Sequence, residues 1–111
     1  SCDELVQTLV AEYAAGTALG WHRDVPQFER IVGVSLGSTA NLRFRPYPYR
    51  PEMKSHVVRL EVAPRSIYRI EGDARWAWQH SVEPTASLRW SITFRTPSEF
   101  RRNHEQYQSA L

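Results

Sequence analysis

The chain has 111 residues, which is enough for one domain with a single hydrophobic core but too few for two. Its formal charge is +2, from 14 basic and 12 acidic residues, so a nucleic-acid partner is compatible with the charge but not indicated by it. One cysteine excludes an intramolecular disulfide and predicts a reducing, cytoplasmic location, and no apolar run is long enough for a membrane span. We therefore expect one domain over residues 1–111, acting as a monomer.

The N-terminal stretch carries two conflicting patterns. Leu5, Leu9 and Tyr13 recur at helical spacing after Asp3, a candidate N-cap, so periodicity predicts a helix over residues 3–15. The same stretch contains the run TLVAEYAAG, whose composition also suits a strand.

From residue 19 onward the chain consists of short runs of β-type composition, separated by joints rich in Gly or Pro. These runs are LGWHRDV, IVGVSLG, ANLRFR, HVVRLEV, SIYRIEG, WAWQHSV and LRWSITFR. Seven or eight strands without intervening helices predict a mainly β fold, a sandwich or a barrel-like roll. The final stretch, PSEFRRNHEQYQSAL, predicts a short C-terminal helix with Ser98 as its N-cap.

The first run contains a candidate metal-binding pair. In an extended chain, His22 and Asp24 point to the same face while Arg23 faces away. Two such side chains suit a metal ion, although a surface strand whose imidazole and carboxylate share a hydrogen bond would show the same pattern.

A second histidine, His80 in WAWQHSV, can join this pair if the two strands are neighbours in a roll. Two imidazoles and one carboxylate leave three metal positions open, the arrangement of non-haem Fe(II) oxygenases. The alternative is that His80 caps a turn or packs beside Trp78. His56 and His104 lack an acid at comparable spacing, and we interpret both as surface residues.

The run RWSITFR places arginines at both ends of one strand face. Alternation puts Arg89, Ser91, Thr93 and Arg95 on this face, and the arginine Cα atoms are separated by roughly 20 Å. Buried arginines need anions, and guanidinium groups bind carboxylates bidentately. The face therefore suits a small dicarboxylate held at both ends, unless the arginines are solvated on an edge strand.

Taken in order, HRD, QHSV and RWSITFR resemble the AlkB family of Fe(II)- and 2-oxoglutarate-dependent dioxygenases. That family has His-x-Asp, a distant His, and Arg-x5-Arg in a strand ending Thr-Phe-Arg. The runs YAAGTALGWHRD, IVGVSLGS and PRSIYRIEGDARWAWQH are also similar, so the resemblance covers most of residues 8 to 96. It implies a double-stranded β-helix, a jelly roll of the cupin kind, and it favours TLVAEY as a strand over the helix.

The resemblance also implies the site residues. His22, Asp24 and His80 would bind Fe(II), Arg89 and the Tyr13 hydroxyl would hold the distal carboxylate of 2-oxoglutarate, and Arg95 would hold the carboxylate nearest the iron. With O2, such enzymes demethylate alkylated nucleic acid in DNA or RNA repair and release formaldehyde, succinate and CO2.

One position departs from the family pattern. The family usually has Asn two residues before the tyrosine, where this chain has Ala11, so an amide contact to 2-oxoglutarate is missing. Ser91 is the residue that we expect to compensate in part.

The segment RFRPYPYRPEMK mixes basic and aromatic residues, which suits a strand of nucleic acid, although a Pro-stiffened hairpin with solvated charges fits as well. We name Arg45, Tyr47, Tyr49 and Trp78 as substrate candidates; Trp76 and Trp78 would share one strand face.

Family members that repair bases carry an N-terminal nucleotide-recognition lid, which is either absent or outside this sequence. Alkylated single-stranded DNA or RNA is the expected partner. Oxygenation of a protein side chain and a non-catalytic metal-binding roll stay open as alternatives.

Overall fold

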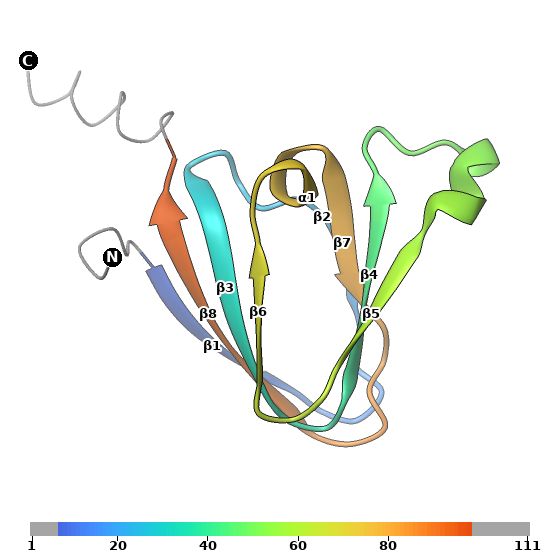
Figure 1. Cartoon of the computed structure of the whole chain (residues 1–111). Helices are drawn as coiled ribbons and strands as arrows, with labels where there is room; N and C mark the ends of the chain where they lie inside the picture. Colours follow the sequence, from blue (N-terminus) through green and yellow to red (C-terminus); the bar gives the residue numbers. More distant parts are fainter. Residues whose placement is uncertain (1–6, 99–111) are drawn as a thin grey trace, which may run out of the picture.

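The structure is a computed structural model that describes residues 7–98. Eight antiparallel strands form two four-stranded sheets (Figure 1). The first sheet has the order β1-β8-β3-β6, and the second has the order β2-β7-β4-β5. The strands are β1 (Gln7–Tyr13), β2 (Leu19–His22), β3 (Phe28–Gly37), β4 (Ala40–Pro46), β5 (Val58–Val62), β6 (Ser66–Ile70), β7 (Trp78–Val82) and β8 (Arg89–Pro97).

The two sheets face each other as the walls of a jelly roll, so the predicted mainly β fold is confirmed. Figure 1 shows the sheets converging at one end and spreading apart at the other, where the short helix α1 (Asp73–Trp76) lies. A 3-10 helix, η2 (Pro51–His56), interrupts the connection between β4 and β5. Within residues 7–98, no helix combines the length and the apolar character that crossing a membrane would require.

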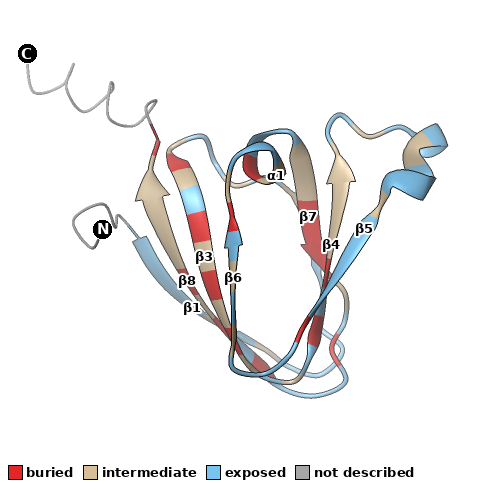
Figure 2. Cartoon of the chain, viewed as in Figure 1, coloured by how far each residue is buried: buried red, intermediate tan, exposed pale blue. Residues whose placement is uncertain are grey.

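The apolar core is small and lies between the sheets. Ala40, Leu42, Val62 and Val82 form one buried cluster, against which Phe44 and Tyr68 pack. Figure 2 shows that burial is concentrated in the central strands of each sheet. The inner face of β8 is buried too, but it is polar, because Arg89, Ser91 and Thr93 are its inward residues. The alternation in RWSITFR thus predicts the inward face of β8 correctly.

The strand at the N-terminus overrides the helical periodicity of this stretch. All seven residues of β1 pair with β8, from Gln7 with Arg95 to Tyr13 with Arg89. The helix over residues 3–15 is therefore wrong for residues 7–13, and the strand that the resemblance favours is confirmed there. Residues 3–6 and the C-terminal helix expected from residue 99 lie outside the described residues.

The segment WAWQHSV is not one strand. Residues 73–76 form α1, with the amides of Arg75 and Trp76 donating to the Gly72 carbonyl, and β7 begins only at Trp78. Trp76 and Trp78 consequently do not share a strand face. Composition alone cannot show this turn, because Arg75 stabilises it by reaching the Phe28 carbonyl, which lies 47 residues away in sequence.

The strand in the run LGWHRDV, which contains the candidate metal-binding pair, is also shorter than predicted. Strand β2 ends at His22, so Arg23 and Asp24 lie in the connection to β3 rather than in an extended strand. In the run HVVRLEV, residues at alternate positions differ in burial, because Val62 is buried while Val58 and Leu60 are exposed.

The core can be tested with one cross-strand pair. Leu42 of β4 lies directly opposite Leu60 of β5, yet Leu42 is 1% exposed and Leu60 is 45% exposed. We expect Leu42→Ala to lower the free energy of unfolding by about 2–5 kcal/mol, because it opens a cavity in the cluster. Chemical denaturation measures this, with Leu60→Ala as the matched control. Equal losses in the two variants would contradict the assignment of the core.

Candidate metal centre

Three metal-type side chains converge between the sheets. The register of β2 and β7 places His22 directly opposite His80, and their ring centroids are 4.3 Å apart. Asp24 follows β2 by two residues and turns back to the same point. One ligand atom from each of His22, Asp24 and His80 lies within 4.8 Å of the others, the only such cluster among the described residues.

The donor atoms are oriented toward a common point without bonding to one another. The Nδ1 atom of His22 donates to the Gly20 carbonyl at 2.9 Å, which leaves Nε2 with its lone pair. The Nε2 atoms of His22 and His80 lie 3.8 Å and 3.9 Å from Asp24 Oδ1. These distances exceed those of hydrogen bonds, and two imidazoles with one carboxylate are the ligand set of the facial triad that binds non-haem Fe(II).

The protonation state of His80 favours metal binding. The pKa of His80 is lowered from 6.5 to about 4, chiefly by burial and then by the neighbouring His22, while Asp24 acts in the opposite direction. The imidazole is therefore neutral near pH 7, the form in which histidine ligates metals.

Asp24 is positioned by a buried arginine that sequence reasoning did not single out. Arg75 of α1 is 2% exposed, and it donates to the Phe28 carbonyl through Nε and Nη2 and to the Val25 carbonyl through Nη2. Arg23 adds a bond of 2.8 Å to the Trp76 carbonyl. These contacts fix both sides of the connection that carries Asp24. Burial lowers the pKa of Arg75, and Asp24 raises it.

Arg95 contacts the triad through the other carboxylate oxygen. Its Nε atom lies 2.5 Å from Asp24 Oδ2, and its Nη1 atom donates to Thr93 Oγ1 and Gln7 Oε1 at 2.7 Å and 3.2 Å. The Asp24 side chain is 7% exposed, so the guanidinium compensates a nearly buried carboxylate and holds it in place.

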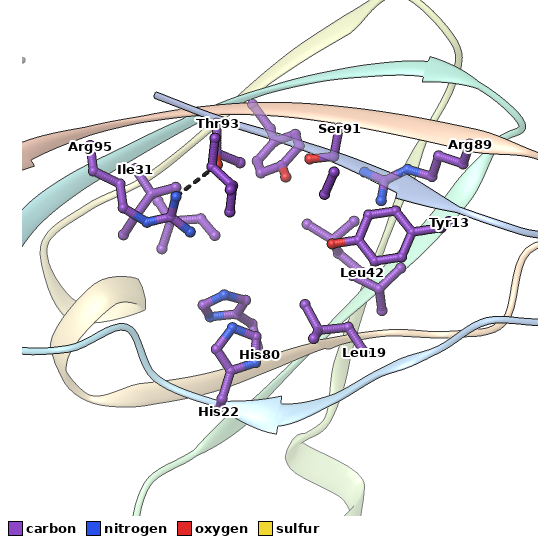
Figure 3. Close-up of a pocket in the computed structure, with 15 residues that line it drawn as sticks. Tyr13, Leu19, His22, Ile31, Leu42, His80, Arg89, Ser91, Thr93 and Arg95 are labelled. Carbon is purple, nitrogen blue, oxygen red and sulfur yellow. Dashed lines mark hydrogen bonds between the residues drawn. The ribbon is translucent and has the colours of Figure 1, made fainter. Parts of the chain in front are cut away.

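Arg89 lies at the other end of the same cavity (Figure 3). It is 1% exposed, its Nε donates to Ser35 Oγ at 2.9 Å, and its guanidinium lies 5.5 Å from the Tyr13 ring. Its Nη2 atom is buried and has no hydrogen-bond partner among the described residues. An unpaired buried guanidinium nitrogen is costly unless an anion binds it, so this end of the cavity fits a carboxylate.

The cavity joins these two ends and has a volume of about 60 Å³. Figure 3 shows Arg89, Tyr13 and Ser91 on one side and Arg95 with Thr93 on the other, with His22 and His80 facing both. Its lining comprises Leu9, Ala11, Tyr13, Leu19, His22, Ile31, Leu42, Tyr68, Ile70, His80, Val82, Arg89, Ser91, Thr93 and Arg95.

Tyr68 is a cavity residue that the sequence did not reveal. It lies opposite Gly33 in the register of β3 and β6, and a Cβ at residue 33 would meet the Tyr68 ring at 2.2 Å. The missing side chain of Gly33 thus admits the Tyr68 ring into the cavity that Ala11 also lines. The only available signal was Gly33 itself, since glycine inside a strand marks close approach.

The predicted substrate residues fall in three places. Arg45 and Tyr49 line a cavity on the outer face of the β2-β7-β4-β5 sheet, away from the triad. Tyr47 is exposed and stacks under the Arg23 guanidinium at 3.8 Å. Trp78 lines an apolar cavity of about 210 Å³ with Phe44, Val58 and Ala74. Of these three places, only the Trp78 cavity adjoins the triad, because the Phe44 and His80 ring centroids are 6.1 Å apart.

Comparison with known proteins agrees with this geometry. Residues 3–102 match the model of the 2OG-Fe(II) oxygenase superfamily. The chain belongs to this superfamily. Uncharacterized protein L905 of Acanthamoeba polyphaga mimivirus is 32% identical over 112 residues, which cover 89% of this chain and 51% of that protein. The solved structure of OsALKBH1 matches with a TM-score of 0.66 at 19% identity, over 80% of this chain and 47% of that one.

The chain thus spans about half the length of these two proteins, and the likeness to OsALKBH1 shows a shared fold. The family match confirms the 2OG-Fe(II) oxygenase that the motifs predict, and the shared fold confirms that the roll is AlkB-like. The superfamily implies Fe(II), 2-oxoglutarate and O2 as cofactor and cosubstrates. The donor set of the triad fits Fe(II), and the unpaired Arg89 nitrogen fits a carboxylate of 2-oxoglutarate.

The buried imidazole makes stability depend on pH in the chelator-treated chain. Because the pKa of His80 is about 4 in the folded chain and 6.5 ordinarily, the unfolded chain binds the extra proton between these values. We expect the free energy of unfolding to fall by an amount on the order of 3 kcal/mol as the pH drops through this window, with no contribution from His80 above it. Denaturant titrations of the wild type and His80→Gln measure this; identical pH profiles would contradict the assigned burial.

Proposed function

We propose that this chain is the catalytic roll of an Fe(II)- and 2-oxoglutarate-dependent dioxygenase. His22, Asp24 and His80 hold the iron, and Arg89, Tyr13, Ser91 and Arg95 hold 2-oxoglutarate. The observation that supports this most strongly is the pairing, in one cavity, of a His-Asp-His cluster with a buried guanidinium whose Nη2 atom has no described partner.

The protein residues contribute position and charge. The Arg89 guanidinium receives the distal carboxylate in a buried pocket, where a charge-assisted bond is strong. Arg95 holds the Asp24 carboxylate in place, and it presents further N–H groups to the carboxylate nearest the metal. Tyr13 and Ser91 line the space between them. Bound iron supplies the oxidation of the substrate by O2, coupled to decarboxylation of 2-oxoglutarate to succinate and CO2.

For the substrate, we infer alkylated single-stranded DNA or RNA, from which an N-methyl group leaves as formaldehyde. The support is the AlkB-like fold and the apolar cavity beside His80, which Phe44 and Trp78 line with flat rings. A methylated base has the flat, apolar faces that such a cavity accommodates by stacking. Single strands are favoured because extruding a base from a duplex costs a few kcal/mol.

Three further proposals concern the domain count, the oligomeric state and the location of the chain. We propose that residues 1–111 form one catalytic domain and that the roll acts as a monomer. An intracellular location is supported by the single cysteine, which cannot form an intramolecular disulfide.

Formaldehyde release tests this function directly. With Fe(II) and 2-oxoglutarate, we expect the chain to release formaldehyde from methylated single-stranded oligonucleotides, and succinate from 2-oxoglutarate, faster than it does with the matched duplexes. Asp24→Ala should reduce turnover by at least about 100-fold, because it removes the only anionic metal ligand and leaves Arg95 without its carboxylate.

Methylated peptides in the same assay separate the alternatives. If formaldehyde is released from the peptides but not from the oligonucleotides, the substrate would be a protein side chain and not nucleic acid. If the chain binds iron but forms no succinate from 2-oxoglutarate with any of these substrates, a non-catalytic roll would be favoured. Full activity of Asp24→Ala would remove the assignment of the triad.

A further inference from the structure

A second cavity lies on the outer face of the β2-β7-β4-β5 sheet, away from the triad. It has a volume of about 380 Å³ and is lined chiefly by Trp21, Arg43, Arg45, Tyr49, Lys54 and Arg59. We call it the basic groove. Strands β2, β4 and β5 supply its floor, and the connection that contains η2 supplies Tyr49 and Lys54.

The register of β4 and β7 shows that the basic groove and the triad lie on opposite faces of this sheet. Phe44 lies opposite His80 on the inner face, and the two rings are in contact. The next pair along, Arg45 and Gln79, points outward and is joined by a hydrogen bond of 2.9 Å from Arg45 Nε to Gln79 Oε1. A nucleotide bound in the basic groove therefore cannot be the one whose base reaches His22 and His80.

The basic groove carries an excess of positive charge. Four of its lining residues are cationic, and the adjacent Glu83 is the single described carboxylate within ion-pair distance of any of them. Glu83 contacts Arg59 at 2.6 Å and Arg43 at 3.7 Å. Among residues 7–98, no carboxylate lies within ion-pair distance of Arg45 or Lys54. Such a concentration of cations attracts a polyanion.

Aromatic rings hold the cations in place. The Arg45 guanidinium lies between two rings, 4.3 Å from the centre of Trp21 and 4.4 Å from that of Tyr49, and Arg43 lies 4.8 Å from Trp21. The Arg45 Nε atom donates to Gln79, and no hydrogen bond from its Nη groups is seen among the described residues, so these groups are available to a phosphate. Arginines and aromatic rings side by side are what a single strand requires, because cations bind its phosphates and rings stack on its bases.

We propose that the basic groove is a separate binding site for the phosphodiester backbone and bases of single-stranded nucleic acid, and that it binds nucleotides flanking the one that reacts. The link to catalysis rests on the proposed function, whereas binding itself does not. A strand that occupies both places must pass around an edge of the sheet, so a long strand gains contacts that a short one cannot make. An acidic peptide would match the charge but has no bases to stack on the rings of Trp21 and Tyr49.

Fluorescence anisotropy on the whole chain, without iron or 2-oxoglutarate, tests the binding. The probes are a labelled oligothymidylate of about 16 nucleotides, a size within the range of single-strand binding sites, and a labelled dinucleotide. We expect the long strand to bind more tightly than the dinucleotide, with an affinity that falls as salt rises. Arg45→Gln combined with Lys54→Gln should weaken the long strand at least tenfold and reduce the slope of log K against log salt by about 1.4, which is 0.7 for each lost phosphate contact.

Two further variants serve as controls. Arg69→Gln removes an exposed cation from the outer face of the other sheet, where Arg69 pairs with Glu71 at 3.0 Å, and it should leave the affinity unchanged. Tyr49→Leu keeps an apolar side chain but removes the ring, and it should weaken binding without changing the salt slope. Thermal unfolding of every variant verifies that the roll is intact.

The outcomes separate the two proposals. Unchanged affinity in the double variant, an equal loss in Arg69→Gln, or competition by polyglutamate as strong as that by unlabelled oligothymidylate would overturn the basic groove as a nucleic-acid site. Groove-dependent binding without release of formaldehyde from any methylated strand would leave the groove standing and contradict the proposed demethylation.

Discussion

A guanidinium buried inside a small roll is the constraint on which the rest of the interior depends. Arg89 is 1% exposed, its Nε atom donates to Ser35 Oγ, and its Nη2 atom has no partner among the described residues. Such a group destabilises the fold unless the surroundings stay polar or an anion binds there. The inward residues of β8 are accordingly Arg89, Ser91 and Thr93 instead of aliphatic side chains, and the apolar core is limited to one small cluster. The resulting pocket is polar, and its unpaired guanidinium nitrogen fits a carboxylate.

Asp24 links this polar interior to the metal-binding end. One carboxylate oxygen faces the two imidazoles, and the other accepts a hydrogen bond from Arg95 on β8. The connection that carries Asp24 is fixed from outside the cavity by Arg75 of α1. The carboxylate is therefore held from two directions without a metal ion, which reduces the entropic cost of ordering it when a metal binds. Burial keeps His80 neutral, so its imidazole does not have to lose a proton when the metal binds.

Local alternation explains which features the sequence predicts well. The inward face of β8 follows from residue types that alternate along the strand, and the mainly β fold follows from the series of short β-type runs. The motifs lead to the 2OG-Fe(II) oxygenase superfamily and to an AlkB-like fold. What the sequence misses depends on contacts between distant segments. Arg75 turns residues 73–76 into a helix by reaching Phe28, and Tyr68 enters the cavity only because Gly33 lies opposite it. Arg45 and Tyr49 belong to the outer face because of the pairing of β4 with β7, which the segment RFRPYPYRPEMK cannot reveal by itself.

We propose that the cavity is a carboxylate site built around Arg89 beside the metal centre. Calorimetric titration of 2-oxoglutarate into the chain loaded with Mn(II), as a redox-stable substitute for Fe(II), tests it most directly. We expect one molecule of 2-oxoglutarate to bind per chain. In Arg89→Gln, the binding free energy should be weaker by roughly 2–5 kcal/mol, because a buried charge pair loses one partner. Arg59→Gln, on the outer face of the other sheet, should bind 2-oxoglutarate like the wild type. Equal affinities for 2-oxoglutarate in the wild type and Arg89→Gln, with both proteins folded and metal-loaded, would contradict a carboxylate site at Arg89.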